Sequence, residues 1–238
     1  MTRSQMLAFV VLVAGCGEKS IVDPPADPAQ IRVFHGAAGV GTINVTAGGQ
    51  SVLSGIDYGS LSKPAEIAVG SVTVEAVSGG VPIAGQMVTL TERQRVTLTL
   101  TKTVGGNAAV SLSVASDTGE ARSDRGNLRI NSAPEAPRAA GDSSGPSTLL
   151  DVYVTPPSAD LNGQNVRMSL ESSYPSYSTF LYYEPGQWLV QFTRAGTKTV
   201  VAQAGPIAFA AGDAKAVVIR RLADGSYATR VETVPERP

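Results

Sequence analysis

His35 is the only histidine of the 238 residues, and histidine is the side chain best suited to acid–base chemistry near neutral pH. Catalysis by a histidine needs a nucleophile and an orienting acid nearby, and the following residues, Gly36-Ala37-Ala38-Gly39, supply neither. Asn131 stands at the matching position in the second half of the chain. Because histidine and asparagine can both hydrogen-bond the backbone at a strand end, we predict a structural role for His35 and no catalytic residue.

Metal and nucleotide sites also lack the residues that they need. One histidine and one cysteine leave only carboxylates as ligands, and no Asp-x-Asp-x-Asp-Gly calcium loop is present. Asp57, Glu66 and Asp151 are isolated in the sequence, which leaves a loosely bound surface calcium as the alternative. The glycines of residues 36–41 are expected to join two strands, whereas a dinucleotide loop leads into a helix. We therefore predict no metal and no cofactor.

The second half of the chain is crowded with aromatic residues, whereas the corresponding stretch of the first half, residues 58–76, contains one. Exposed tyrosines on a sheet can bind a sugar, a peptide or a partner domain, because the ring offers a large contact area and a polar tip. The alternative is packing in the core and at a seam between domains. The candidate binding surface consists of Tyr174, Tyr177, Tyr182 and Tyr183.

Cys16 is the only cysteine, and it follows a short apolar run that contains residues 6–15. About ten apolar residues are typical of a signal peptide, whereas a membrane-spanning helix needs about 20. The sequence Leu-Val-Ala-Gly-Cys resembles the bacterial lipoprotein signal, which implies removal of residues 1–15 and a lipid on Cys16. The alternative is an ordinary secretory signal with an incidental cysteine. Because Gly17 replaces the aspartate that retains lipoproteins at the inner membrane, the resemblance implies a lipid-anchored protein of the cell envelope, at the outer membrane, on its periplasmic or surface face.

Downstream of Cys16 the pattern is that of β-structure. Residues 16–30 contain a proline-rich stretch that is expected to form an extended tether. From Ile31 onward, apolar residues recur with a period of two, and Gly and Pro interrupt them at short spacing, which is typical of an all-β fold. The net charge of -1 predicts no nucleic-acid partner. A single cysteine allows no disulfide within the chain, so burial alone must stabilise the core.

The strand pattern occurs twice in the sequence. Leu128-Arg129-Ile130 and Ile31-Arg32-Val33 share the pattern of an arginine between two apolar residues. Gly70 and Gly186 each precede a strand with alternating apolar residues. An internal repeat of this size indicates two copies of one domain. We predict tandem immunoglobulin-like antiparallel β-sandwiches at residues 31–116 and 127–238, joined by a linker at residues 117–126.

Both halves resemble the domain of unknown function 4397 family. The residues that carry the resemblance are Arg32-Val33-Phe34-His35, Tyr58-Gly59 running to Gly70, Asn131 to Pro137, and Asp151-Val152-Tyr153-Val154. The first copy departs from the family pattern at residues 36–39, and the second inserts residues 138–147. The family occurs in bacterial lipoproteins and surface proteins, often in tandem, and the resemblance implies no established activity.

The function expected from these features is a non-catalytic binding or scaffolding role in the cell envelope. The lipid would provide the contact with the membrane, and an envelope glycan or protein would be the partner. One alternative is a hydrolase that acts on envelope glycans with carboxylates alone, which paired acids in one cleft would favour. The other is a purely structural spacer, which the absence of an exposed apolar patch would favour. Because this expectation rests partly on analogy, it needs a site to support it.

Overall fold

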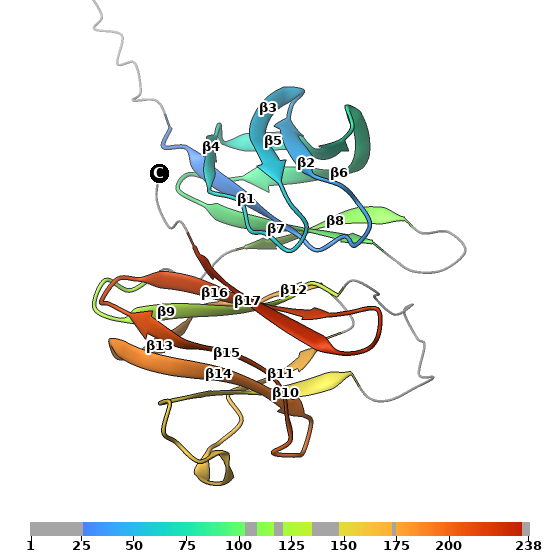
Figure 1. Ribbon diagram of the computed structural model, residues 1–238. Coiled ribbons are helices and arrows are strands. Elements are labelled where there is room, and N and C mark those ends of the chain that lie inside the picture. The colour runs from blue at the N-terminus through green and yellow to red at the C-terminus, as the bar shows by residue number, and fades with distance from the viewer. Residues whose placement is uncertain (1–25, 103–108, 117–120, 135–147, 173–174, 235–238) are drawn as a thin grey trace, which may run out of the picture.

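The computed structural model describes residues 26–102, 109–116, 121–134, 148–172 and 175–234. Within these ranges the chain forms seventeen strands and one short 3₁₀ helix, so the predicted all-β class is confirmed. The strands build four sheets, which pair into two sandwiches stacked one on the other (Figure 1). No helix of the described part is long and apolar enough to span a membrane.

The first sandwich contains two four-stranded sheets. One has the order β4-β1-β7-β8, and the other has the order β3-β2-β5-β6. Strand β1 is parallel to β7, while the other neighbours are antiparallel. The core between the sheets is built from alternating residues such as Ile31, Val45, Val74 and Leu98. The strands are β1 (Ala29–His35), β2 (Ile43–Ala47), β3 (Gln50–Ile56), β4 (Ala65–Ile67), β5 (Gly70–Ser78), β6 (Val81–Leu90), β7 (Arg95–Lys102) and β8 (Val110–Ser116).

The second sandwich repeats this arrangement. One sheet has the order β12-β9-β16-β17, with β13 also pairing β9, and the other has the order β11-β10-β14-β15. Its core contains Leu128, Val152, Phe192 and Val217. The 3₁₀ helix η1 covers Leu161–Gly163. The strands are β9 (Gly126–Ser132), β10 (Leu149–Thr155), β11 (Met168–Glu171), β12 (Ser176–Tyr177), β13 (Leu181–Tyr183), β14 (Gly186–Arg194), β15 (Val200–Phe209), β16 (Ala214–Arg221) and β17 (Tyr227–Thr233).

The two sandwiches match strand for strand, with β12 and β13 together in the place of β4. β9 runs parallel to β16, as β1 does to β7. Gly70 and Gly186 open β5 and β14 with φ of 116° and 149°, a region that favours glycine, so the repeated glycine has a backbone reason. The boundary predicted at residues 117–126 follows β8 and includes Gly126, the first residue of β9. Its position stays a prediction, since residues 117–120 lie outside the described ranges.

The narrower expectation of an immunoglobulin-like strand order is not confirmed. In an immunoglobulin constant domain the first strand neighbours the second in a sheet of order ABED. Here β1 lies between β4 and β7, and β2 belongs to the other sheet. The alternation of apolar residues determines which face of a strand is buried, but it does not determine which strand lies beside it.

The two central strands of one sheet in each sandwich, β1 and β7 in the first and β9 and β16 in the second, are buried on both faces along most of their length. Every residue of β9 is buried, and β1 has a single residue that is not. The inward faces belong to the two sandwich cores, and the outward faces of β1, β7, β9 and β16 meet between the sandwiches (Figure 1). Polar, charged and aromatic side chains of both halves therefore gather at this contact, which we call the seam.

Candidate functional site

The three described tyrosines of the predicted surface, Tyr177, Tyr182 and Tyr183, do not lie together on one exposed surface. Tyr177 on β12 packs in the seam beside Phe34 of the first sandwich. Tyr182 on β13 packs beside a small cluster that contains Phe180, with Arg122 4.3 Å from its ring centroid. Tyr183 instead points to the core of the second sandwich, where its ring lies 4.9 Å from that of Trp188. Tyr174 lies outside the described residues, as does Cys16.

A stack of arginines and aromatic rings occupies the centre of the seam. Arg129 on β9 is 1% exposed, and its Cζ lies 3.8 Å from the ring centroid of Phe180 and 4.6 Å from that of Tyr177. Arg32 on β1 approaches Tyr177 at 5.6 Å. Tyr177 is thus in contact with one arginine from each sandwich. A desolvated cation–π contact contributes about 2 kcal/mol, which helps offset the cost of burying the charge.

Hydrogen bonds fix both arginines in this stack. Arg129 Nη1 donates to the carbonyl of Ser178 at 2.9 Å, on the segment between β12 and β13. Arg32 Nε donates to Thr97 Oγ1 of the neighbouring β7 at 3.1 Å. The residue patterns of β1 and β9 place Arg32 and Arg129 at equivalent positions, so the repeat itself brings two arginines to the same contact.

An apolar cluster lies beside the stack. Phe34, Ala133 and Val218 are fully buried there, with Tyr58 and Leu61 packed against them. The Tyr58 hydroxyl donates to the carbonyl of Ala133 across the seam. Since this contact contains apolar and hydrogen-bonded groups from both halves, it resembles an interface that restrains domains more than one that lets them move freely.

Charged groups form the border of the seam. Arg230 Nη2 lies 2.5 Å from Glu232 Oε1 on the same strand, β17, and donates to Ser60 Oγ of the first sandwich at 3.3 Å. Burial raises the pKa of the Glu232 carboxyl above its ordinary value, and the charge of Arg230 opposes this shift. The border of the seam is therefore polar, and the hydrogen bond from Arg230 links it to the segment between β3 and β4.

A glycine permits a close approach of the two halves. A Cβ added at Gly36 would lie 2.5 Å from Cβ of Pro175, which precedes β12, and 3.1 Å from the carbonyl oxygen of Leu100. Such a distance does not occur between real side-chain atoms, so only glycine fits. The signal for this residue was present in the sequence, because the departure from the family pattern begins at Gly36.

His35 is fully buried at the end of β1 and holds the segment that follows it. Its Nε2 faces the carbonyl of Gly41 at 3.0 Å, and its Nδ1 accepts from the N–H of Ala37 at 3.3 Å, which requires the neutral Nε2–H tautomer. Burial lowers the pKa of His35 below 6.5, and the contact with Gly41 opposes this shift. The backbone hydrogen bonding predicted for this histidine is thus observed.

The residue equivalent to His35 is Ser132, and the assignment of Asn131 to that position is wrong by one residue. His35 pairs with Leu100, and Ser132 pairs with Ile219, at corresponding places in the parallel ladders. A shift of one residue turns a side chain to the opposite face of a strand. Ser132 is buried, and its hydroxyl donates to the carbonyl of Ser172 at 3.5 Å.

The isolated carboxylates have separate structural contacts. Asp151 on β10 accepts from the N–H of Gly196 at 2.8 Å and from Ser169 Oγ at 2.9 Å. Asp57 accepts from Thr42 Oγ1 at 2.7 Å in the first sandwich, and Glu66 lies on β4. Among the described residues, no three His, Cys, Asp or Glu side chains are grouped as a metal site would require.

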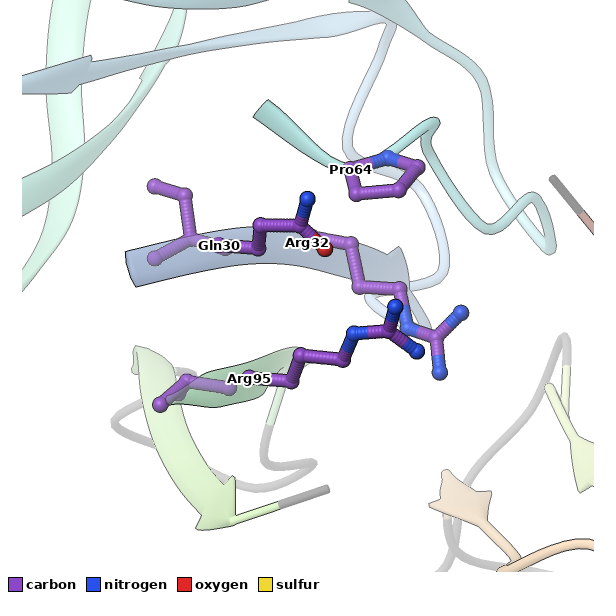
Figure 2. A pocket seen from close by; sticks show the side chains of 6 residues that line it. Gln30, Arg32, Pro64 and Arg95 are labelled. Atoms are coloured by element: carbon purple, nitrogen blue, oxygen red, sulfur yellow. The ribbon is translucent and has the colours of Figure 1, made fainter. Parts of the chain in front are cut away.

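A small cavity lies against β1 on the first sandwich. Figure 2 shows Arg32 and Arg95 extending in the same direction beside Gln30, with Pro64 across from them. The cavity has a volume of about 10 Å³, which is room for about one water molecule. The Oε1 atom of Gln30 is buried without a hydrogen-bond partner among the described residues. A single water fits this position, whereas an organic ligand does not.

Two open depressions are larger. One, of about 390 Å³, is lined by Asp27, Pro28, Gln30, Arg93 and Arg95, and Arg93 Nη2 lies 2.5 Å from Asp27 Oδ2 within it. The other, of about 230 Å³, lies between β9, β11 and β12, where Glu171 accepts from the Thr148 hydroxyl. Each depression is lined by one carboxylate among the described residues, whereas acid–base hydrolysis with carboxylates uses two.

One further motif is present in the sequence. Residues 141–145 have the pattern Gly-x-Ser-x-Gly, with Ser143 at the nucleophile position, and they lie outside the described residues. In hydrolases this motif works at a sharp turn from a strand into a helix. The described residues contain no α-helix.

Comparison with known sequences identifies the first sandwich. No curated protein matches this chain. Residues 29–139, from β1 through β9 and beyond, match the model of a domain of unknown function, DUF4397. The resemblance predicted from the sequence is confirmed over these residues, which are similar to the DUF4397 family.

Proposed function

We propose that this protein is a non-catalytic module of the cell envelope, which a lipid on Cys16 attaches to a membrane. The two sandwiches act as one rigid unit that scaffolds or presents a surface to another envelope component. The observation that carries this proposal is the seam, in which Arg129 and Phe34 are buried and Tyr177 is half-buried between the halves. A restrained pair of domains on an extended tether suits scaffolding more than it suits chemistry.

The placement of the polar groups supports a binding or scaffolding role over hydrolysis. Hydrolysis with carboxylates requires two acids in one cleft, and each of the two open depressions described above is lined by one carboxylate among the described residues. The buried Asn127 also secures the entry to the second sandwich, because its side chain hydrogen-bonds the backbone of Arg122, Arg125 and Asp213.

Exposed apolar residues favour a surface that meets a partner over a spacer that meets none. Val81 is 63% exposed and Met87 is 69% exposed, and both lie on β6 of the first sandwich. Large apolar side chains that gather on one strand of a soluble domain commonly mark a contact site.

The lipid anchor is tested by labelling cells with a fatty-acid analogue and purifying the chain. We expect the wild-type protein to carry the label and to sediment with membranes, and Cys16→Ser to lose the label. Ser20→Ala, in the same tether, is the matched control and should keep it. A wild-type chain without label, or a Cys16→Ser variant that retains it, would contradict the proposal.

A further inference from the structure

His35 joins two segments of the first sandwich, residues 36–41 and 57–61. Its ring hydrogen-bonds the backbone of the first segment through both nitrogens. Its own N–H donates to the carbonyl of Ser60 at 2.9 Å, and its carbonyl accepts from the N–H of Gly59 at 2.7 Å. The residue is fully buried, so both segments are closed around it. We call them the His35 segments.

Both His35 segments also contact the second sandwich. In the first segment, Gly36 packs against Pro175. In the second, the Tyr58 hydroxyl donates to the carbonyl of Ala133. The Tyr58 ring lies edge-on to the ring of His35, with the centroids 6.0 Å apart and the planes at 89°. A displacement of the His35 ring would therefore disturb contacts across the seam on both segments.

The arrangement around His35 requires a neutral ring. Nδ1 accepts from the N–H of Ala37, while Nε2–H donates to the carbonyl of Gly41. In the imidazolium both nitrogens carry a proton and only donate. A protonated Nδ1 would face the N–H of Ala37 with donor against donor, and the charge would be buried away from water. The ring can therefore bind a proton only after the first segment has moved away from it.

The electrostatic surroundings also favour the neutral ring. Burial lowers the pKa of His35, whereas its backbone hydrogen bonds and the charge of Asp57 oppose this shift. The other charged groups that face the His35 segments, among the described residues, are Lys102 of β7 and, from the second sandwich, Arg220, Arg230 and Glu232. Three of these four are cations, which disfavour a further positive charge nearby. The closed seam therefore keeps His35 neutral.

We propose that His35 is a pH-sensitive switch of the seam, whose protonation releases the His35 segments and separates the sandwiches while each keeps its fold. A released ring returns toward the ordinary pKa of 6.5, above that of the buried ring, so the proton favours the separated state. The ratio of separated to joined molecules should rise as the pH falls below 6.5, by up to about tenfold for each pH unit. The inference rests on the rigid pairing proposed above, but it would stand even if Cys16 carried no lipid.

Small-angle scattering of the chain from residue 17 onward, which retains every described residue, measures the separation. We expect the radius of gyration to stay constant above pH 6.5 and to increase below it, while far-ultraviolet circular dichroism shows intact strands. His35→Gln should remove this increase, because glutamine donates and accepts hydrogen bonds but does not titrate. No increase at any pH at which the strands persist, or an increase that accompanies their loss, would overturn the inference.

Glu232→Gln is the matched control, because it removes another group at the seam whose pKa is shifted, and it should keep the increase in the radius of gyration. Tyr58→Phe supplies a second test that does not depend on folding of the His35 variant. It deletes the hydrogen bond to Ala133, which weakens the joined state, so the increase should begin at a higher pH. An increase that His35→Gln retains, that Glu232→Gln abolishes, or that Tyr58→Phe leaves at the same pH would contradict the switch.

Discussion

The two sandwiches have the same strand order but contribute different side chains to the seam between them. At equivalent positions the first presents Phe34, Thr97 and Thr99, and the second presents Asn131, Ala216 and Val218. The aromatic rings of the second half come from the segment around β12 and β13, which replaces the single strand β4 of the first. A duplicated fold has thus been adapted at one edge, where Tyr177 and Phe180 pack in the contact between the two copies.

The largest difference that we expect between equivalent residues concerns Arg129 and Arg32. Arg129→Ala should lower the free energy of unfolding by about 3 kcal/mol, because it removes two close cation–π contacts and leaves a cavity. Arg32→Ala should lower the free energy of unfolding by about 1 kcal/mol, since its contact with the Tyr177 ring is longer. Urea denaturation measures both. If both variants lost the same free energy of unfolding, Arg129 would not be the more important arginine of the stack.

A second test exchanges a residue of one copy for its equivalent in the other. Gly36 of the first sandwich corresponds to Ala133 of the second, as their N–H groups bond the carbonyls of Leu100 and Ile219. Gly36→Ala should cost about 2 kcal/mol, because the new Cβ would overlap Pro175.

Small-angle scattering would show whether Gly36→Ala also separates the sandwiches, by an increase in the radius of gyration. The control is Gly41→Ala in the same connection, where the new Cβ would meet only Ser78 Oγ at 3.9 Å. If Gly41→Ala were as unstable as Gly36→Ala, the loss of stability would come from the connection between β1 and β2 and not from the seam.

The smallest expected effect is a pH dependence of the free energy of unfolding that comes from His35. Its equivalent in the second sandwich, Ser132, does not titrate. The pKa of His35 is lower in the folded protein than its ordinary value of 6.5, so the unfolded chain binds the proton more readily. The free energy of unfolding should therefore fall as the pH drops below about 6.5. His35→Gln should reduce this dependence between pH 6.5 and the folded-state pKa. Urea denaturation across that range would contradict the assignment if both proteins had the same slope.

Two strands and two turn glycines were predicted correctly from the sequence. The strand at Ile31 to Phe34, its repeat at Leu128 to Ile130, and the turn glycines Gly70 and Gly186 were all predicted, because local alternation and backbone freedom leave direct traces in the sequence. The error of one residue at Asn131 has the opposite cause. Aligning the repeats by motif ignored the parity of the strand, which decides the face that a side chain occupies.

The amino-acid sequence by itself determined the strands, their buried faces and the duplication, since each follows from the pattern of neighbouring residues. Only the tertiary structure decided that Tyr177 lies between Arg32 and Arg129, that Tyr183 packs in a core, and that β1 neighbours β7. The physical reason is that the neighbour of a strand, and the use of its outer face, depend on residues far away along the chain, which periodicity does not encode.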